Sequence, residues 1–303
     1  MKFITAETLN SDSIKIFISE SDLPDTPKGV IHIYHGLAEY FGRYTHTTKY
    51  LNSLGYHVVG IDHRGHGHWI ESGAVPGFFA EKDGWNLVVD DMETSFKKIQ
   101  TVYEDIPHII LAHSMGTWLT LALLQRDISP SKVILSASSK LSVTKLMLQK
   151  LIIKIIKFFK GPKSQSHFSD LLTTQQFNSQ FKPNRTTHDW LSSNHESVDA
   201  YINNPLCGFI PTNQLYEDLA DGVIESFSHK KMLSIDKNLS ILLIAGTQDP
   251  VGESGRGVEA LHKFLGKYNK SVKLVLLPEL RHEILNEIKK EQALSKISEF
   301  LNS

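Results

Sequence analysis

The sequence has 303 residues, enough to bury a large core in one sizeable domain with an insertion or in two smaller domains. Its 32 basic and 33 acidic residues give a formal charge of -1, so no overall positive field favours nucleic acid as a partner. The single cysteine, Cys207, excludes an internal disulfide and agrees with a reducing compartment. The start lacks the apolar segment of a signal peptide, and no stretch reaches 18 uninterrupted apolar residues, which predicts a cytoplasmic protein.

The N-terminal residues predict a β-hairpin, because apolar segments at residues 2–9 and 13–19 flank a polar turn at Asn10, Ser11 and Asp12. From residue 30 onwards, short apolar segments alternate with stretches of helical period. We expect strands at residues 30–34, 57–61, 108–112, 132–135, 241–245 and 272–277, and helices at about 43–54, 86–103, 118–124 and from about Ile284 to the C-terminus. This alternation predicts an α/β protein with a mostly parallel central sheet and helices on both faces.

Residues 140–237 depart from this alternation. They contain several helix-like segments, no convincing strand and a polar connector around Pro162. We therefore expect a helical cap inserted between two strands of the same sheet. The predicted organisation is a core of residues 1–139 and 238–303, with residues 140–237 as the cap.

The most informative motif is Ala112-His113-Ser114-Met115-Gly116, which stands between a predicted buried strand and a predicted helix. A serine on a sharp strand-to-helix turn is exposed above the sheet, where an acyl-transfer nucleophile is needed. The first position holds alanine in place of glycine, and its methyl group still lets strand and helix approach closely. A motif this short also fits a serine in a surface loop. Whether Ser114 is a nucleophile therefore depends on finding a catalytic base and acid elsewhere in the chain.

Two candidate partners follow later strands. Asp249 lies in the turn-rich segment 246–252, and His282 follows the strand at 272–277. The order Ser114, Asp249, His282, with each residue just beyond a strand, is the order expected of an α/β-hydrolase. We therefore predict that His282 accepts the serine proton. Asp249 is expected to fix the imidazole tautomer and to stabilise the imidazolium.

A tetrahedral intermediate also needs fixed N–H donors where negative charge develops. The segment His35-Gly36-Leu37, directly after the strand at 30–34, supplies a candidate oxyanion hole. We expect the backbone N–H groups of Leu37 and Met115 to be the two donors. His35, Gly36 and His113 are expected beside them as possible pocket residues.

Several of these motifs together resemble one known family, the monoacylglycerol lipase and bacterial lysophospholipase branch of the serine α/β-hydrolases, which is similar to serine aminopeptidase S33. They are HGLAE at residues 35–39 with GRY at 42–44, DHRGHG at 62–67, and HSMG at 113–116. The segments DPVG at 249–252 and RHEILNE at 281–287 are similar to the acid and histidine loops of bacterial members. In the predicted cap, DWLS at 189–192 and NPLCG at 204–208 also resemble the family, so the resemblance spans nearly the whole chain.

The resemblance implies a serine carboxylic-ester hydrolase acting on a monoacyl lipid, a monoacylglycerol or a lysophospholipid, through an acyl-enzyme intermediate and without metal or organic cofactor. It also suggests that Glu39 and Arg43 line the end of the pocket that holds the leaving alcohol, whereas their spacing suits a local ion pair. Two alternatives stay open. One is a peptidase or thioesterase with the same triad, and the other is a non-catalytic ligand-binding protein on a hydrolase fold.

Three histidines, His63, His66 and His68, have a spacing that invites interpretation as a metal site. The interleaved Arg64 would oppose the charge of a metal ion, and the glycines around it suit a tight loop after the strand. We therefore expect a loop here and no metal.

Residues 145–160 predict an amphipathic basic helix within the cap. Its lysines, Lys150, Lys154, Lys157 and Lys160, gather on one side, and its leucines, isoleucines and phenylalanines occupy the other. One interpretation is that the apolar face packs over the active site and the lysines are solvated. The other is a lid that contacts an anionic bilayer, peripheral to the inner membrane surface, and admits a single-chain lipid from it.

Overall fold

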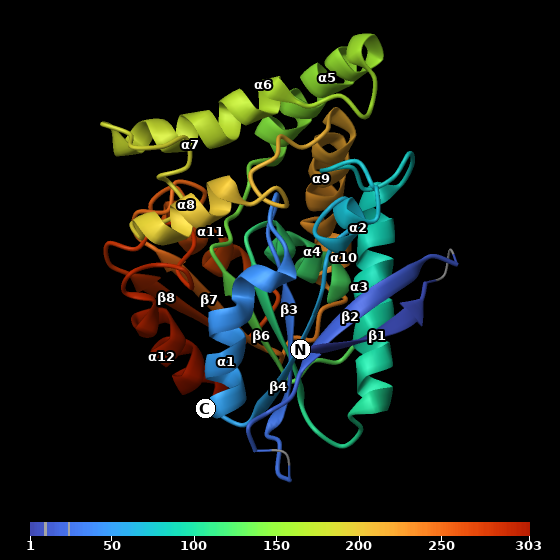
Figure 1. Cartoon of the computed structure of the whole chain (residues 1–303), viewed down its shortest axis with the longest axis vertical. Helices are drawn as coiled ribbons and strands as arrows, with labels where there is room; N and C mark the ends of the chain where they lie inside the picture. The colour runs from blue at the N-terminus through green and yellow to red at the C-terminus, as the bar shows by residue number, and fades with distance from the viewer. Residues whose placement is uncertain (9–10, 24) are drawn as a thin grey trace.

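The computed structural model describes residues 1–8, 11–23 and 25–303, and at its centre eight strands form one sheet in the order β1-β2-β4-β3-β5-β6-β7-β8 (Figure 1). The strands are β1 (Lys2–Glu7), β2 (Ser13–Ser19), β3 (Gly29–Tyr34), β4 (Tyr56–Ile61), β5 (His108–His113), β6 (Lys132–Ser136), β7 (Ser240–Gly246) and β8 (Val272–Leu277). β2 is antiparallel to β1 and to β4, whereas the other pairings are parallel. The predicted mostly parallel sheet is confirmed. Leu9 and Asn10, predicted at the end of the first strand and in the turn, lie outside the described residues.

The central strands β3, β4 and β5 are buried at every residue, which explains why their sequences are nearly continuous apolar runs. Successive side chains point to opposite faces of the sheet and so enter two separate hydrophobic cores. Ile110 belongs to one core, and its neighbours Ile109 and Leu111 belong to the other. With both faces of the sheet occupied, polar side chains gather at the carboxyl ends of the parallel strands.

Helices cover both faces of the sheet (Figure 1). Those outside the predicted cap are α1 (Thr45–Ser53), α2 (His68–Glu71), α3 (Gly84–Val102), α4 (Met115–Leu123), α11 (Arg256–Leu265) and α12 (Lys290–Leu301). α3 and α4 pack on one face of the sheet, and α1 and α12 pack on the other. The sequence predicted that the last helix begins at about Ile284, but α12 begins at Lys290. Residues 284–289 instead form turns, in which the Glu287 carboxylate accepts the backbone N–H of Arg281.

The helices inserted between β6 and β7 lie mostly at the top of the molecule in Figure 1, whereas α10 lies lower, at the level of the sheet. They are α5 (Val143–Lys160), α6 (His167–Asp170), α7 (Gln176–Asn178), α8 (His195–Asn203), α9 (Asn213–Ser226) and α10 (His229–Met232), and all fall within residues 140–237. α9 contacts α5 on one side and α3 and α4 on the other. The inserted helices are thereby joined to the layer of helices that covers the sheet.

The amphipathic helix α5 was expected in one interpretation to pack its apolar face over the site and to leave its lysines in water. Its orientation in the structure is different. Lys150 pairs with Asp221 of α9, and Lys157 pairs with Glu217, one turn earlier on the same helix. Most of the apolar side is turned to solvent, with Leu148 62% exposed and Phe158 84% exposed. The apolar face therefore does not pack over the site with the lysines in water. The acidic side chains of α9 attract the lysines inward, because ion pairs offset the cost of moving them from water.

Candidate active site

Ser114 lies on a strained turn between β5 and α4. Its φ of 50° and ψ of -120° are rare for a residue with a side chain, and the Ser114 N–H donates to the Ser136 carbonyl at 2.9 Å. The turn brings α4 so close to β3 that a Cβ at Gly116 would stand 2.4 Å from the Tyr34 carbonyl oxygen. This requirement explains the glycine of the motif, whereas Ala112 is accommodated fully buried in β5.

The structure brings Ser114, His282 and Asp249 together at the carboxyl ends of β5, β8 and β7. The Ser114 Oγ is 2.9 Å from His282 Nε2, and His282 Nδ1 is 2.9 Å from Asp249 Oδ1. Because the carboxylate only accepts, Nδ1 carries the proton, and Nε2 is then free to accept the serine hydroxyl proton. Asp249 is fully buried, and its Oδ1 also accepts the Val251 N–H at 2.9 Å, which fixes the carboxylate.

Two histidines beside the serine have different electrostatic environments. Burial favours the neutral imidazole of His282, but the Asp249 carboxylate outweighs burial and raises the pKa of His282 above its ordinary value. Burial lowers the pKa of His113 to about 4, helped by the nearby His282. His113 is therefore neutral at pH 7, and His282 is the more basic of the two imidazoles.

Leu37 and Met115, the predicted oxyanion donors, both line the cavity above Ser114. Neither backbone N–H has an acceptor within the part of the chain that the structure describes. Gly36 and His113, predicted as pocket residues, line the same cavity. The Gly36 N–H is already engaged, because it donates to Glu39 Oε1 at 2.6 Å. The loop after β3 thus leaves the Leu37 N–H free to act as a donor.

The remaining predicted pocket residues are His35, Glu39 and Arg43, and only one of them lines the cavity. Glu39 lines it, whereas His35 and Arg43 are absent from its wall. His35 is fully buried behind the loop, where its Nε2 accepts the His63 N–H at 3.0 Å. Arg43 is held away from the cavity between two carboxylates. The Glu39–Arg43 ion pair suggested by their spacing is confirmed, at 2.9 Å.

Sequence reasoning missed the second carboxylate, Glu283. Arg43 donates two hydrogen bonds to it, at 2.5 and 2.7 Å, and thereby connects the loop after β3 to the loop that carries His282. Burial acts to raise the pKa of Glu283, but the Arg43 guanidinium outweighs it and holds this pKa at about 2. An acidic residue directly after the predicted histidine was the available signal, but the 240 residues between the partners conceal the pairing.

His63 and His66 lie in a buried loop after β4, as expected, whereas the buried His68 begins the short helix α2. His66 Nδ1 lies 2.9 Å from the Arg64 carbonyl oxygen, and His68 Nδ1 lies 3.3 Å from Asp62 Oδ2. Within residues 1–8, 11–23 and 25–303, no group of three or more His, Cys, Asp or Glu side chains has an arrangement that suits a metal ion. Each of these three histidines has a hydrogen-bond partner in the protein for one of its ring nitrogens.

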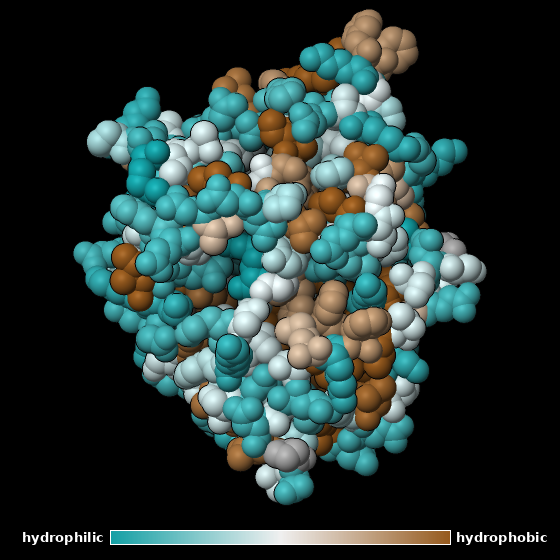
Figure 2. Space-filling model, in the orientation of Figure 1, coloured by the Kyte–Doolittle hydropathy of each residue, from teal (hydrophilic) through white to brown (hydrophobic). Residues whose placement is uncertain are grey.

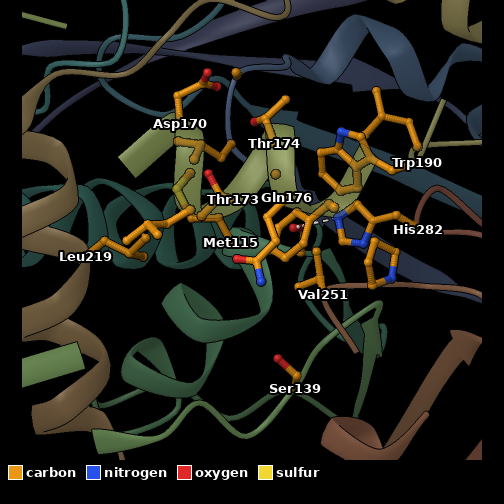
Figure 3. Close-up of a pocket in the computed structure, with 18 of the residues that line it drawn as sticks. Met115, Ser139, Asp170, Thr173, Thr174, Gln176, Trp190, Leu219, Val251 and His282 are labelled. Carbon is orange, nitrogen blue, oxygen red and sulfur yellow. Dashed lines mark hydrogen bonds between the residues drawn. The ribbon is translucent and has the colours of Figure 1, made fainter. Parts of the chain in front are cut away.

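A cavity of about 1100 Å³ opens above Ser114, between the sheet and the inserted helices (Figure 3). Its apolar wall comes from several elements and includes Met115, Trp118, Leu146, Leu219, Ala220 and Val251. Its polar wall comes largely from residues 170–180 and includes Asp170, Thr173 and Gln176. In Figure 3, Met115 and Leu219 lie to one side of the hydrogen bond at His282, and Trp190 lies beside the imidazole on the other. The site therefore offers both an apolar compartment and a polar rim.

Known proteins similar to this chain include lipases and esterases. A monoacylglycerol lipase of Mycolicibacterium smegmatis is 36% identical over 100 residues, which are 33% of this chain and 34% of that lipase. The monoglyceride lipase of Rattus norvegicus is 24% identical over 303 residues, covering 92% of this chain and 87% of the rat protein. A thermostable carboxyl esterase from Bacillus coagulans, solved in complex with glycerol, has a TM-score of 0.89 at 25% identity, covering 99% of this chain and 97% of the esterase. The match to the mycobacterial lipase thus spans about a third of that relative's length.

One family covers most of the chain. The family described as serine aminopeptidase, S33, matches residues 25–289, which contain β3 to β8, the inserted helices and every residue of the candidate site. The strand order and the position of Ser114 after β5 agree with the α/β-hydrolase fold of that family. The chain therefore belongs to the serine aminopeptidase S33 family of α/β-hydrolases.

Proposed function

We propose that the protein is a serine carboxylic-ester hydrolase that acts on monoacyl lipids, either monoacylglycerols or lysophospholipids. The observation that carries the proposal is the continuous hydrogen-bonded series from Asp249 through His282 to Ser114, at the base of a cavity of about 1100 Å³. The similarity to monoacylglycerol lipases and to a carboxyl esterase supports the same class of reaction.

The proposed reaction proceeds through an acyl-enzyme. Ser114 Oγ attacks the ester carbonyl while His282 Nε2 takes the hydroxyl proton, and the N–H groups of Leu37 and Met115 donate to the oxyanion. His282 then gives the proton to the leaving alcohol, and an ester forms between Ser114 and the fatty acid. Water attacks this ester with His282 again as base, which releases the acid and restores Ser114.

The two walls of the cavity suit the two parts of a monoacyl lipid. A cavity of this volume, slightly above the roughly 300–1,000 Å³ of most small-ligand sites, has room for a long acyl chain. Met115, adjacent to the nucleophile, continues into the apolar wall toward Leu219, where burial of each methylene contributes about 0.8 kcal/mol. The hydroxyl and amide groups of Thr173 and Gln176, which also line the cavity, suit a polar head group.

The family description names an aminopeptidase, an enzyme that cleaves the amino-terminal peptide bond of its substrate. Charge pairing at the site favours an ester substrate over such a peptide. An aminopeptidase needs a carboxylate free to bind the substrate ammonium beside the nucleophile. Glu39 and Glu283, which stand next to the Leu37 and His282 loops, are both already paired with Arg43, while Asp170 and Glu253 line other parts of the cavity. Matched ester, amide and thioester substrates test this inference, and we expect the ester to be hydrolysed fastest. Faster hydrolysis of the amide would support the peptidase.

The proposed nucleophile is tested by a fluorophosphonate probe together with a hydrolysis panel of monoacylglycerols, lysophospholipids and short synthetic esters. We expect labelling at Ser114, and Ser114→Ala should lose labelling and roughly four to six orders of magnitude of turnover. Ser295→Ala, on the distant helix α12, is the matched control and should retain both. If folded protein is not labelled, the chain is better explained as a non-catalytic binding protein.

We further propose that residues 140–237 act as a cap whose helix α5 contacts a membrane surface. Support comes from the exposed apolar side chains of α5, which are Met147, Leu148, Leu151, Ile155, Phe158 and Phe159. Figure 2 shows apolar residues at the surface over the top of the molecule, where Figure 1 places α5. Lys150 and Lys157 are paired with acidic side chains of α9, which leaves exposed lysines such as Lys154 and Lys160 to attract anionic lipid, so we expect apolar insertion to contribute more to the contact. No helix of the described residues is long and apolar enough to span a bilayer.

Sedimentation with phosphatidylcholine vesicles tests the proposed contact. We expect the protein to bind these zwitterionic vesicles and to bind anionic vesicles no more than a few-fold better. The double variant Leu151→Glu with Phe158→Glu should bind neither, because each change places a charge on the apolar face. Leu233→Glu, at an exposed leucine beyond α10, is the matched control and should bind like the unaltered protein. Binding that required anionic lipid would indicate a basic surface instead.

A further inference from the structure

The loop that carries His282 is bound to one short segment of the inserted helices, Asp189–Ser193, which we call the clamp. The Leu191 carbonyl accepts the Glu283 N–H at 2.7 Å, directly after the histidine. Arg281, directly before the histidine, donates to the Asp189 carbonyl at 2.5 Å. The Ser193 N–H donates to Glu287 at 3.0 Å. The clamp therefore holds the chain on both sides of His282.

The clamp is held in place by hydrogen bonds and by one aromatic contact with neighbouring residues. The buried Asp189 carboxylate accepts hydrogen bonds from the backbone N–H groups of Arg185 and Thr186, at 2.6 and 3.0 Å. The Trp190 backbone N–H donates to Asn178 Oδ1 at 3.1 Å, and the Trp190 ring lies 5.2 Å from that of Phe177. These contacts leave the Trp190 indole little freedom to move away from the site.

Trp190 packs against the imidazole of His282. The two ring centroids are 5.0 Å apart and the rings are inclined by 36°. Figure 3 shows Trp190 beside His282. The His113 ring lies 4.9 Å from His282. A cation within about 6 Å of an indole is attracted by the negative face of the ring, and this attraction is stronger where water is excluded. The neutral imidazole gains much less from the same contact.

We propose that Trp190 is a positioning residue for the reaction, which holds the His282 imidazole in line with Ser114 and stabilises its protonated form. The inference rests on the proposed role of His282 as the base. Since the imidazolium forms in the transition state of both acylation and deacylation, the contact accelerates each step. The clamp then has a function beyond covering the site, because it carries this indole to the base.

Other charged and titratable groups also influence His282 and must stay unchanged in a test. They are Asp249 after β7, His113 at the end of β5, Glu283 on the same loop, and Glu39 with its partner Arg43. His188, next to the clamp in sequence, lines the same cavity and must also stay unchanged. Replacing tryptophan by fluorotryptophans leaves all of these in place, since fluorine weakens the negative face of the indole with little change in its shape.

The experiment measures the rate of Ser114 phosphonylation by a fluorophosphonate between pH 5 and 9, in protein made with tryptophan or with mono-, di- or trifluorotryptophan. Trp190→Phe made with the same amino acids is the control, because the fluorine also enters Trp69, Trp85 and Trp118. We expect the acidic limb of the profile to move to lower pH by about 0.3 to 1 unit as fluorines are added. The maximal rate should fall about 2- to 10-fold.

In Trp190→Phe, added fluorine should move neither the acidic limb nor the maximal rate. Unfluorinated Trp190→Phe should retain more of the maximal rate than Trp190→Leu, because phenylalanine keeps an aromatic face. Equal profiles in the plain and the fluorinated protein would overturn the proposal, as would an equal shift in the Trp190→Phe series. Absence of any labelling of the unaltered protein would instead refute the proposed function on which the inference rests.

Discussion

Replacing Arg43 by methionine should destabilise the protein more than any ordinary loss of a surface charge. The guanidinium lies between Glu39 and Glu283, and all three side chains are at most 10% exposed. Arg43→Met keeps much of the side-chain volume but leaves two carboxylates buried together without a cation. One of them must then take up a proton or draw in water.

The size of the loss follows from the pKa of Glu283. Arg43 holds it at about 2, against an ordinary 4.5, and at about 1.4 kcal/mol per unit this is ~3 kcal/mol of stability at pH 7. Removing one partner of a buried ion pair costs about 3–5 kcal/mol in general, which agrees. For a chain of this length, that loss lowers the unfolding midpoint by about 5–8 °C.

The loss should also depend on pH. A carboxylate whose pKa is lowered in the folded state contributes its full stability above the unfolded pKa, near 4.5, and loses it as the pH falls toward 2. Thermal unfolding followed by circular dichroism should therefore separate Arg43→Met from the unaltered protein strongly at pH 7 and much less at pH 3. Arg126→Met, which breaks a half-exposed pair with Asp90, is the matched control and should stay within about 0.5 kcal/mol. An Arg43→Met midpoint within 1–2 °C of the unaltered protein at pH 7 would refute the reasoning.

Two further predictions concern the base and the turn at the nucleophile. Because Asp249 raises the pKa of His282 above 6.5, kcat/KM should fall as the pH drops through a value above 6.5, and an activity unchanged down to pH 5 would contradict the role of His282 as base. Gly116→Ala would place a Cβ 2.4 Å from a backbone oxygen, so we expect about 1–3 kcal/mol of destabilisation in urea unfolding together with lost activity. In Gly266→Ala the nearest atom is 3.3 Å away, so that variant should unfold nearly as the unaltered protein does.

The parts of the site that sequence reasoning predicted are those set by strand ends. Ser114, Asp249 and His282 each follow a parallel strand of the sheet, and parallel strands deliver their carboxyl ends to one edge. Position along the chain therefore determines position in space for these three residues. The Leu37 N–H follows the same rule, because it stands just after β3.

The parts that sequence reasoning did not predict depend on contacts between loops and helices. Arg43 was expected at the cavity, but Glu283 holds it away from the wall, and nothing near Arg43 in the sequence indicates that partner. Trp190 stood within a segment resembling the family, yet its contact with His282 depends on how the clamp folds back onto the histidine loop. Periodicity describes one element at a time and does not identify these pairings.

Helix α5 illustrates the same limit on a larger scale. Its sequence establishes two faces, but which face turns inward depends on the helix against which it packs. α9 presents Glu217 and Asp221, so Lys150 and Lys157 face the protein beside the buried Ile153, and part of the positive charge of α5 is paired internally. The outward face then exposes large apolar side chains such as Phe158. Moving each of them from water into an apolar environment would stabilise it by about 1.5–3 kcal/mol. A surface of this kind is stabilised by contact with another apolar phase, and the monoacyl lipids proposed as substrates reside in one.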